Sequence, residues 1–250
     1  AQLVFETVNS TGMKLTQAQL IKNYILMCVA PDKQIDLYDN YWKPVETKLN
    51  PIEFDEFFGY YMIVKTQAKV SQEYYKNFKT FMRTSKMNVE DIVREMKSFS
   101  DYYLRWKNAE QKNTNLDKKI VCLKEIGTKQ VIPTIMQLLF DLEQNKCEES
   151  DVFKVLDIIE SYLMRIKICT MTIDLSNVCL KILKSLGNSE NCENYVSRIS
   201  ACIYNLTDTQ HMPTDDEIIT KLHSVNIYAK KFASKLLAKI ETHENKDYTY

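Results

Sequence analysis

Glycine and proline are scarce in this sequence. Its 250 residues include four glycines and five prolines, although these residues end helices and form most tight turns. A β-sandwich or an alternation of strands and helices needs many such turns, so both architectures are disfavoured. Long stretches rich in leucine, isoleucine, lysine and glutamate favour helices instead. We predict an all-α protein, a multi-helix bundle of roughly 10–12 helices that forms one domain or two helical subdomains.

The sequence also lacks net charge, long apolar runs and paired cysteines. It has 33 basic and 33 acidic residues, so no global field attracts nucleic acid, and a DNA contact would need a local patch or a further part of the protein. No apolar run approaches the roughly 18 residues that a membrane helix needs, and no signal peptide is present. Seven cysteines without Cys-x-x-Cys spacing indicate free thiols in a reducing compartment. We therefore expect a cytoplasmic protein with no membrane partner.

No catalytic motif is recognisable. His211, His223 and His243 are 12 and 20 residues apart, which fits neither an HExxH nor an HNH arrangement, so each is interpreted as a surface residue. The sequence contains no Walker loop, no GxGxxG and no GxSxG. We assign no catalytic residue and no metal ligand, and we expect this stretch by itself to be inactive.

A polar break lies near the start of the chain. Asn9 and Gly12 enclose a Ser-Thr pair, a composition that suits chain reversal, because glycine accepts positive φ and asparagine bonds its own backbone. The preceding residues, 1–8, fit a helix, which we favour, although a short strand fits as well. The break therefore separates two elements.

A capped helix is predicted directly after this break. Thr16 stands three residues before Gln19, the spacing at which the two side chains cap a helix start reciprocally. Apolar residues follow at three- and four-residue intervals and form a face too wide for a solvated helix. They are Ala18, Leu20, Ile21, Tyr24, Ile25, Met27 and Cys28. Taken alone, this pattern indicates a turn followed by a core helix.

The same segment resembles a motif of the GmrSD-type modification-dependent restriction proteins, F-E-x-(I/V/L)-N-x-x-G-x-x-L-(T/S)-x-x-(D/Q)-L-I-(K/R)-N. The matching residues are Phe5, Glu6, Asn9, Gly12, Leu15, Thr16, Leu20, Ile21, Lys22 and Asn23, while Gln19 stands where the family often has Asp. In that family the motif closes a ParB-like nucleotide-binding domain whose upstream half carries an Asp-Gly-Gln-Gln-Arg signature, which this sequence lacks. The resemblance implies that Asn9, Gly12 and Lys22 lie nearest to the nucleotide.

Further helices are expected along the chain, separated by proline and polar breaks. Ala30-Pro31-Asp32 and Asn50-Pro51 should end elements, because proline lacks an N–H and disfavours helix before it. The predicted helices cover about 35–49, 53–67, 71–85, 89–108, 116–126 and 131–144. The second of these carries Phe54, Phe57, Phe58, Tyr60 and Tyr61. Aromatic clusters can stack on bases, but helical spacing favours core packing here.

The most polar stretch, residues 107–115, has no apolar anchor and is interpreted as an exposed loop between two subdomains. Because the chain starts at Ala1 without a methionine, we expect an excised fragment. The predicted division is the end of a nucleotide-binding domain (1–30), a first helical subdomain (31–108), a second helical subdomain (116–245) and a linker towards a missing C-terminal domain (246–250).

A second informative stretch spans residues 150–183. Its apolar face comprises Val152, Val155, Leu156, Ile159, Leu163 and Ile166. Asp157, Ser161 and Arg165 form a polar line at four-residue spacing along the same helix. A solvated flank with weak charge pairing accounts for this line, and the alternative is a functional site.

This stretch is similar to the I-E-S-Y-L-x-R-R-x-I-C-x-x-x-T block of the same restriction family. The matching residues are Ile159, Glu160, Ser161, Tyr162, Leu163, Arg165, Ile168, Cys169 and Thr172. The family's second arginine is missing, since Ile166 follows Arg165. The resemblance makes Arg165 and Ser161 candidates for a contact with a ligand or between domains.

A third block closes the chain. Thr214 precedes Asp215, Asp216 and Glu217, which complement the positive end of a helix dipole when Thr214 caps that helix. Three carboxylates can also bind a metal, but without a neighbouring His or Cys a solvated capping turn is favoured. Residues 212–217, 226–228 and 236–241 resemble the family's P-(T/S)-D-(D/E)-E-F … Y … Y-L-L-x-x-L-E ending, after which an HNH nuclease often follows.

Three blocks in the family's order predict the central helical region of a GmrSD-like modification-dependent restriction or phage-defence protein. This region would couple a nucleotide-binding domain to a nuclease domain and be non-catalytic itself. The resemblance implies a parent that is an NTP-dependent endonuclease using an NTP and a divalent metal ion, with no cofactor in this stretch. Its partners would be the missing ParB-like and HNH domains, and DNA through the parent. The competing hypothesis is a helical protein–protein interaction scaffold without a nucleotide role.

Overall fold

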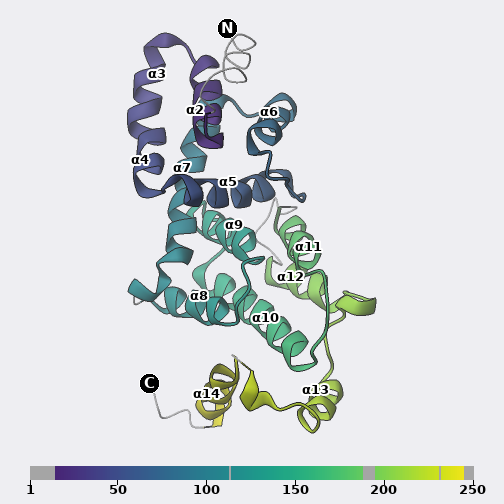
Figure 1. Ribbon diagram of the computed structural model, residues 1–250. Helices are drawn as coiled ribbons and strands as arrows, with labels where there is room; N and C mark the ends of the chain where they lie inside the picture. Colours follow the sequence, from purple (N-terminus) through teal and green to yellow (C-terminus); the bar gives the residue numbers. More distant parts are fainter. Residues whose placement is uncertain (1–14, 113, 188–194, 231, 245–250) are drawn as a thin grey trace. The chain divides into compact units, whose positions relative to one another are not determined.

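The described part of the chain is mostly helical. A computed structural model describes residues 15–112, 114–187, 195–230 and 232–244, and these ranges contain helices and turns but no strand (Figure 1). The all-α prediction is confirmed. The chain divides into two compact units, Ala1–Leu104 and Arg105–Tyr250. None of the described helices is both long enough and apolar enough to cross a bilayer.

Unit 1 contains the capped helix that the sequence predicts. Thr16 accepts a hydrogen bond from the Gln19 backbone N–H, and the Gln19 side chain accepts one from the Thr16 N–H at 2.9 Å. The helices of this unit are α2 (Gln17–Met27), α3 (Pro31–Leu37), the π-helical turn η1 (Tyr38–Trp42), α4 (Lys43–Lys48), α5 (Pro51–Thr66), α6 (Tyr74–Thr84) and most of α7 (Val89–Lys107). The capping prediction is confirmed because it depends only on neighbours in sequence.

The predicted apolar face of α2 packs into the core of unit 1, except at the C-terminal end of the helix. Ile21 and Ile25 are buried, together with Ala18 and Leu20. Met27 and Cys28 are exposed, however. They lie at the last residue and the C-cap of α2, off the packed face, so the prediction for these two residues was wrong.

Two prolines were expected to end helices, but each of them begins one. Pro31 and Pro51 occupy the first turns of α3 and α5, so these helices start before the predicted positions at Ile35 and Glu53. Proline suits the first turn, because its fixed φ is helical and its missing N–H would have no partner there. The predicted helix over 35–49 is also interrupted by the π-helical turn η1.

An aromatic core fills unit 1, as predicted. Phe54, Phe57, Phe58 and Tyr61 of α5 are all buried, and Phe54 stacks on Phe58 with ring centroids 5.7 Å apart. Such pairs add to the free energy of burial. The base-stacking alternative is therefore wrong for these four rings.

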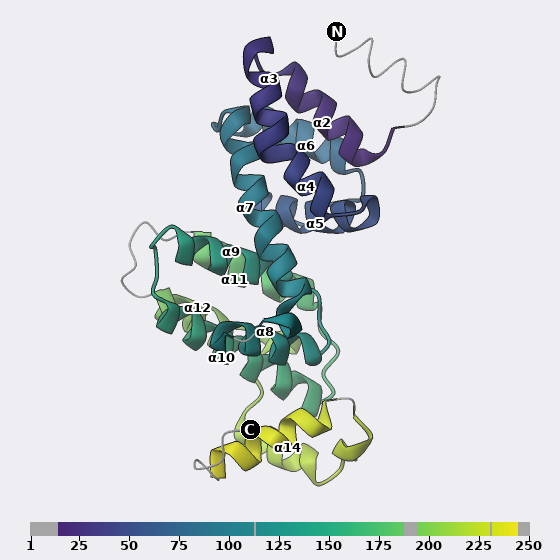
Figure 2. The same ribbon diagram turned by 90° about the vertical axis from the view of Figure 1, so that its left-hand side faces the viewer.

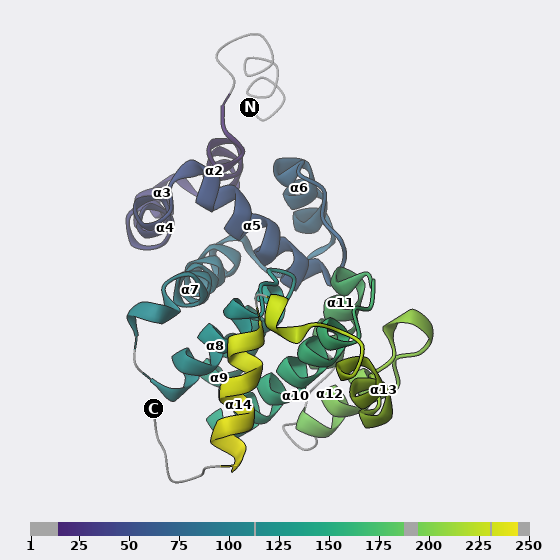
Figure 3. The same cartoon turned by 60° about the horizontal axis from the view of Figure 1, so that its bottom comes forward.

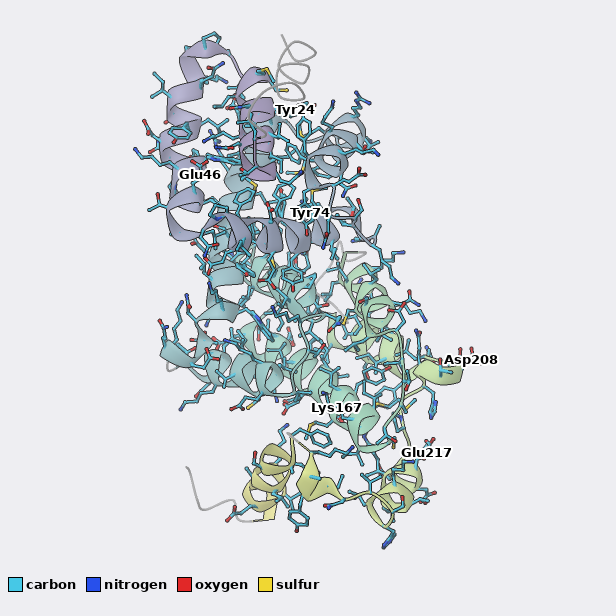
Figure 4. The ribbon with its side chains drawn as sticks, in the orientation of Figure 1. Tyr24, Glu46, Tyr74, Lys167, Asp208 and Glu217 are labelled. Atoms are coloured by element: carbon cyan, nitrogen blue, oxygen red, sulfur yellow. The ribbon has the colours of Figure 1, made fainter. Side chains whose placement is uncertain are left out.

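A glycine allows α6 to approach α5 closely. A Cβ on Gly59 would lie 3.0 Å from the Tyr74 hydroxyl oxygen, and Tyr74 packs edge-on against Phe58. The glycine thus makes room for the start of α6, which Figure 4 shows at the labelled Tyr74.

Unit 2 is built around α10, which contacts α8, α9, α12 and α13. Figure 2 shows α9 and α11 on one side of this unit and α8, α10 and α12 on the other. Its elements are the 3-10 turn η2 (Ala109–Gln111), α8 (Asn115–Glu125), α9 (Ile132–Glu143), α10 (Glu149–Ile168), α11 (Leu175–Gly187), α12 (Tyr195–Tyr204), η3 (Asp208–Gln210), α13 (Asp215–Leu222), η4 (Ile227–Ala229) and α14 (Ala233–Glu244).

Residues 107–112 of the polar stretch pack against other residues of unit 2 and do not form a plain exposed loop. Ala109 is fully buried and starts the 3-10 turn η2. Lys124 donates a hydrogen bond to the Lys107 carbonyl at 2.7 Å and pairs with Glu110. The exposed-loop prediction was wrong for Ala109, because a small side chain in a polar run can anchor a turn. The two units divide earlier, at Leu104 and Arg105 within α7.

Candidate functional site

The five predicted site residues fall into three groups. Asn9 and Gly12 lie outside the described residues. Lys22 belongs to α2 in unit 1, whereas Ser161 and Arg165 belong to α10 in unit 2. Among the described residues, Ser161 and Arg165 lie one helical turn apart and line a common cavity.

Lys22 joins α2 to α4. Its ammonium lies 2.7 Å from Glu46 Oε1 and 5.5 Å from the centre of the Tyr38 ring. The Tyr38 hydroxyl also donates to Glu46, at 3.5 Å, and Glu46 is labelled in Figure 4. The Lys22 side chain is 21% exposed. Its charge is thus matched inside unit 1, and a phosphate approaching it would compete with Glu46.

Helix α10 provides the platform for Ser161 and Arg165. Glu148 and Asp151 form a capping box at its start. All six residues of the predicted apolar face are buried, namely Val152, Val155, Leu156, Ile159, Leu163 and Ile166. The face prediction is confirmed, and this packing holds the polar line on the opposite side of the helix in a fixed direction.

Arg165 connects α10 to the start of α13. Its Nη1 donates to the Pro213 carbonyl at 2.8 Å, and its Nη2 lies 2.6 Å from Asp215 Oδ1. A guanidinium suits this role, because its fixed fork reaches a carbonyl and a carboxylate at once. The arginine therefore positions the first turn of α13.

A cavity of about 260 Å³ lies beside this contact. Both α13 and α14 approach α10 at this side of unit 2 (Figure 3). The lining residues are Ser161, Met164, Arg165 and Ile168 of α10, Ile218 of α13, and Leu236 and Lys239 of α14. The wall is mainly apolar, with one serine hydroxyl and two cationic side chains.

A buried carboxylate balances the cations near this cavity. Glu160 is buried and pairs with Lys239 of α14 at 2.6 Å. Lys119 of α8 also contacts Glu160 and the neighbouring Asp157. Asp157, Ser161 and Arg165 are thus not a plain solvated flank, since two of the three bind other helices through charge pairs. Glu160 fixes α8 and α14 on α10 in the same way.

A histidine lies beside the acidic first turn of α13. His211 places Nδ1 2.8 Å from the Asp208 carbonyl and Nε2 2.9 Å from Glu217 Oε1. The Asp208 carbonyl, followed by the Glu217 carboxylate, raises the pKa of His211. The Thr214 backbone N–H, together with His211, lowers the pKa of Glu217. Asp208 and Glu217 are labelled in Figure 4.

The capping prediction for this turn is confirmed, because Thr214 and Glu217 form a capping box. The expectation that no histidine neighbours the carboxylates was wrong. A six-residue separation follows no helical spacing rule, so the irregular chain between η3 and α13 brings His211 there.

The tyrosine and cysteine side chains around α10 have raised pKa values. Burial raises the pKa of Tyr162 to about 12 and that of Cys179 to about 12. Burial, followed by Glu217, also raises the pKa of Cys169. These groups stay neutral near pH 7 and are weak nucleophiles. Among the described residues, no three His, Cys, Asp or Glu side chains are grouped to hold a metal ion.

Sequence reasoning missed most of the partners around this cavity. Lys119 and Lys239 lie far from α10 in the chain, so no spacing rule connects them to Glu160. Tyr162 matched a family motif, yet its hydroxyl in fact donates to the Gln210 carbonyl at 2.9 Å. Comparison with family models, with curated proteins and with solved structures finds no match.

Proposed function

We propose that this chain is a non-catalytic helical coupling module, the central helical region of a GmrSD-like restriction or phage-defence protein. The observation that supports this is the attachment of α13. No residue of α13 is buried, and the helix is tied to α10 by Arg165 and to the preceding turn by His211. A helix held by polar contacts at one end can change position without disrupting the core.

The energetics suit such a role. Exposed ion pairs contribute about 0–1 kcal/mol each, and Asp215 is 81% exposed. Two positions of α13 would therefore differ by a small free energy, which a ligand or a neighbouring domain can reverse. Tight burial of α13 would have opposed this function.

The remaining predictions enter as parts of the same proposal. Asn9, Gly12 and Lys22 lie nearest to a nucleotide that the ParB-like domain of the parent binds. Ser161 and Arg165 contact a ligand or a neighbouring domain of the parent. The NTP, the divalent metal ion and the HNH nuclease act outside this stretch, and DNA is cut by the parent. The proposed location is the cytoplasm.

The test uses the longest protein whose reading frame contains this sequence. Arg165→Ala and Asn9→Ala should fold with near-normal melting temperatures and lose most nucleotide-stimulated DNA cleavage, since removing a positioned contact to a charged group typically costs a few kcal/mol. Gly12→Val should instead impair folding if Gly12 adopts positive φ.

Exchanging the charges of Arg165 and Asp215 makes this test more specific. Arg165→Asp combined with Asp215→Arg should restore part of the cleavage that either change removes, because the pair is re-formed in reverse. Lys154→Ala is the matched control, an exposed cation on the same helix that pairs only locally with Asp151. Wild-type cleavage in both Arg165→Ala and Asn9→Ala would reject the coupling role.

One observation favours the second candidate, a protein–protein interaction scaffold. Ile219 and Leu222 of α13, Tyr228 of η4, and Leu237 and Ile240 of α14 are large apolar side chains that are exposed. Exposed apolar groups gather at protein interfaces. Nucleotide binding distinguishes the two candidates: calorimetric titration of the same long protein with GTP and with ATP should give saturable heat for a coupling module and none for a scaffold.

A further inference from the structure

The cavity beside Arg165 has an apolar floor that is part of the core of unit 2. Met164 and Ile168 of α10 line the cavity, and both are buried. Ile218 of α13 and Leu236 of α14 form its walls and are half-buried. In Figure 1, α13 and α14 lie on the same side of α10, within one unit. This lining favours an apolar occupant, because contact with it removes apolar surface from water.

The volume of the cavity limits the size of that occupant. It measures about 260 Å³, whereas an apolar cavity of about 150 Å³ holds benzene and sites for drug-sized ligands start at about 300 Å³. The cavity therefore suits one substituted aromatic ring or an aliphatic chain of about eight carbons. A lipid with two long acyl chains is too large for it.

The polar side chains of the lining determine which charge the ligand carries. Ser161, Arg165 and Lys239 lie among the apolar residues, and no carboxylate of the described residues lines the cavity. Ser161 and Lys239 are exposed, so they mark its mouth. A guanidinium binds a carboxylate through two parallel hydrogen bonds, whereas a cationic ligand would be repelled by both positive side chains. The lining therefore favours an anionic head group.

The present contacts of the two cations are compatible with such a ligand. Arg165 donates through Nη1 to the Pro213 carbonyl and through Nη2 to Asp215, and a guanidinium has further N–H donors. Asp215 is mostly exposed, so water weakens its attraction to the guanidinium. Lys239 pairs with Glu160 at 2.6 Å and contributes its positive charge at the mouth without leaving that pair.

From these observations we infer that the cavity between α10, α13 and α14 binds an apolar monocarboxylate, whose body packs on Met164 and Leu236 and whose carboxylate contacts Arg165. Such a ligand touches α10 and α13 together, so its binding favours the position in which α13 lies on α10. This inference deepens the proposed function and rests on it, because it names a ligand for Ser161 and Arg165. Binding needs neither a nucleotide nor DNA and can be measured on this chain alone.

The experiment titrates the whole 250-residue chain with octanoate at pH 7 in a calorimeter, and saturable heat is expected. Affinity should rise about fourfold for each methylene added between butanoate and octanoate, and it should level off for longer chains once the cavity is full. 1-Octanol and octylammonium share the alkyl chain but lack the negative charge. Both should bind more weakly than octanoate, and octylammonium should bind most weakly.

Two pairs of variants test the location of the site. Ile218→Phe and Leu236→Phe each enlarge a side chain that lines the cavity, and each should weaken octanoate binding roughly tenfold. Ile219→Phe and Leu237→Phe make the same changes at the next residue of each helix, where the side chain is exposed. These two matched controls should keep the affinity within about twofold of the wild type. Melting curves establish that all four variants are folded.

A further variant tests the contact with the carboxylate. Arg165→Gln should weaken octanoate binding roughly tenfold and leave 1-octanol binding unchanged, since the alcohol has no carboxylate. Lys154→Gln removes an exposed cation from the same helix and should change neither affinity. An equal loss for octanoate and 1-octanol in Arg165→Gln would show that Arg165 only positions α13, and it would overturn the assignment of the carboxylate contact.

Other outcomes would overturn the whole inference. These are no saturable heat with octanoate, equal losses in the cavity variants and their matched controls, or tighter binding of octylammonium. An affinity that keeps rising beyond decanoate would indicate an open apolar surface instead of a cavity of this size. Failure of octanoate binding leaves the cleavage test of Arg165→Ala unaffected, because a neighbouring domain can still contact Arg165. Wild-type cleavage by Arg165→Ala and Asn9→Ala together with intact octanoate binding would reject the coupling role and keep the ligand site.

Discussion

Two isoleucines on successive helices, one buried and one exposed, distinguish the effect of core packing from that of helix propensity. Ile21 of α2 is 0% exposed, and Ile35 of α3 is 74% exposed. Ile21→Ala should lower the free energy of unfolding by about 2–5 kcal/mol, because it removes buried methylene groups and leaves a cavity. Denaturant unfolding followed by circular dichroism gives the value, and Ile25→Ala should behave like Ile21→Ala.

Ile35→Ala is the matched control for this prediction. It makes the same chemical change on an exposed helical surface, so its effect should stay within about 0.5 kcal/mol. Equal shifts for Ile21→Ala and Ile35→Ala would show that α2 does not contribute to the core of unit 1.

At the scale of elements, α13 should respond to pH through His211. The pKa of His211 is raised in the folded protein, so its stabilising contribution is complete below its ordinary value of 6.5 and is lost as pH rises through the higher folded value. The pKa of Glu217 is lowered, so its contribution is complete above 4.5 and is lost as pH falls through the lower folded value. The His211–Glu217 contact is therefore strongest between pH 4.5 and pH 6.5.

Hydrogen exchange measures this dependence. After correction for intrinsic rates, the backbone amides of α13 should exchange more slowly at pH 5.5 than at pH 8, and His211→Gln should remove most of the difference. His223→Gln removes an imidazole from the other end of the same helix and should preserve the difference. If His211→Gln retained the full pH effect, the Glu217 contact would not control α13.

At the scale of the whole molecule, the proposed non-catalytic role predicts that the chain by itself is inactive. Burial raises the pKa of Tyr162 and of Cys179 beside α10, so both side chains are protonated near pH 7. Under this proposal, purified chain should neither hydrolyse GTP or ATP nor cleave DNA in the presence of Mg²⁺. Activity that follows the protein through a further purification step would contradict this prediction and indicate a site elsewhere in the chain.

The sequence by itself determined the features that depend on near neighbours in the chain. Thr16 with Gln19 and Thr214 with Glu217 cap helices, because each pair needs only a three-residue spacing. The apolar face of α10 follows from helical periodicity in the same way, and the scarcity of glycine and proline favoured helices over sheets. At Pro31 and Pro51 the sequence predicted only the end of one helix, although each proline also begins the next helix.

Tertiary structure alone decided the surroundings of the candidate site. Arg165 and Asp215 are 50 residues apart, and Lys239 reaches Glu160 from the last helix. Phe78 of α6 is visible in the sequence as one more aromatic residue, yet only packing against Tyr24 of α2 and Phe58 of α5 buries it. The physical reason is that the attraction between two charges depends on their distance in space and not on their separation along the chain. The folded core determines which distant side chains come within a few ångströms of each other.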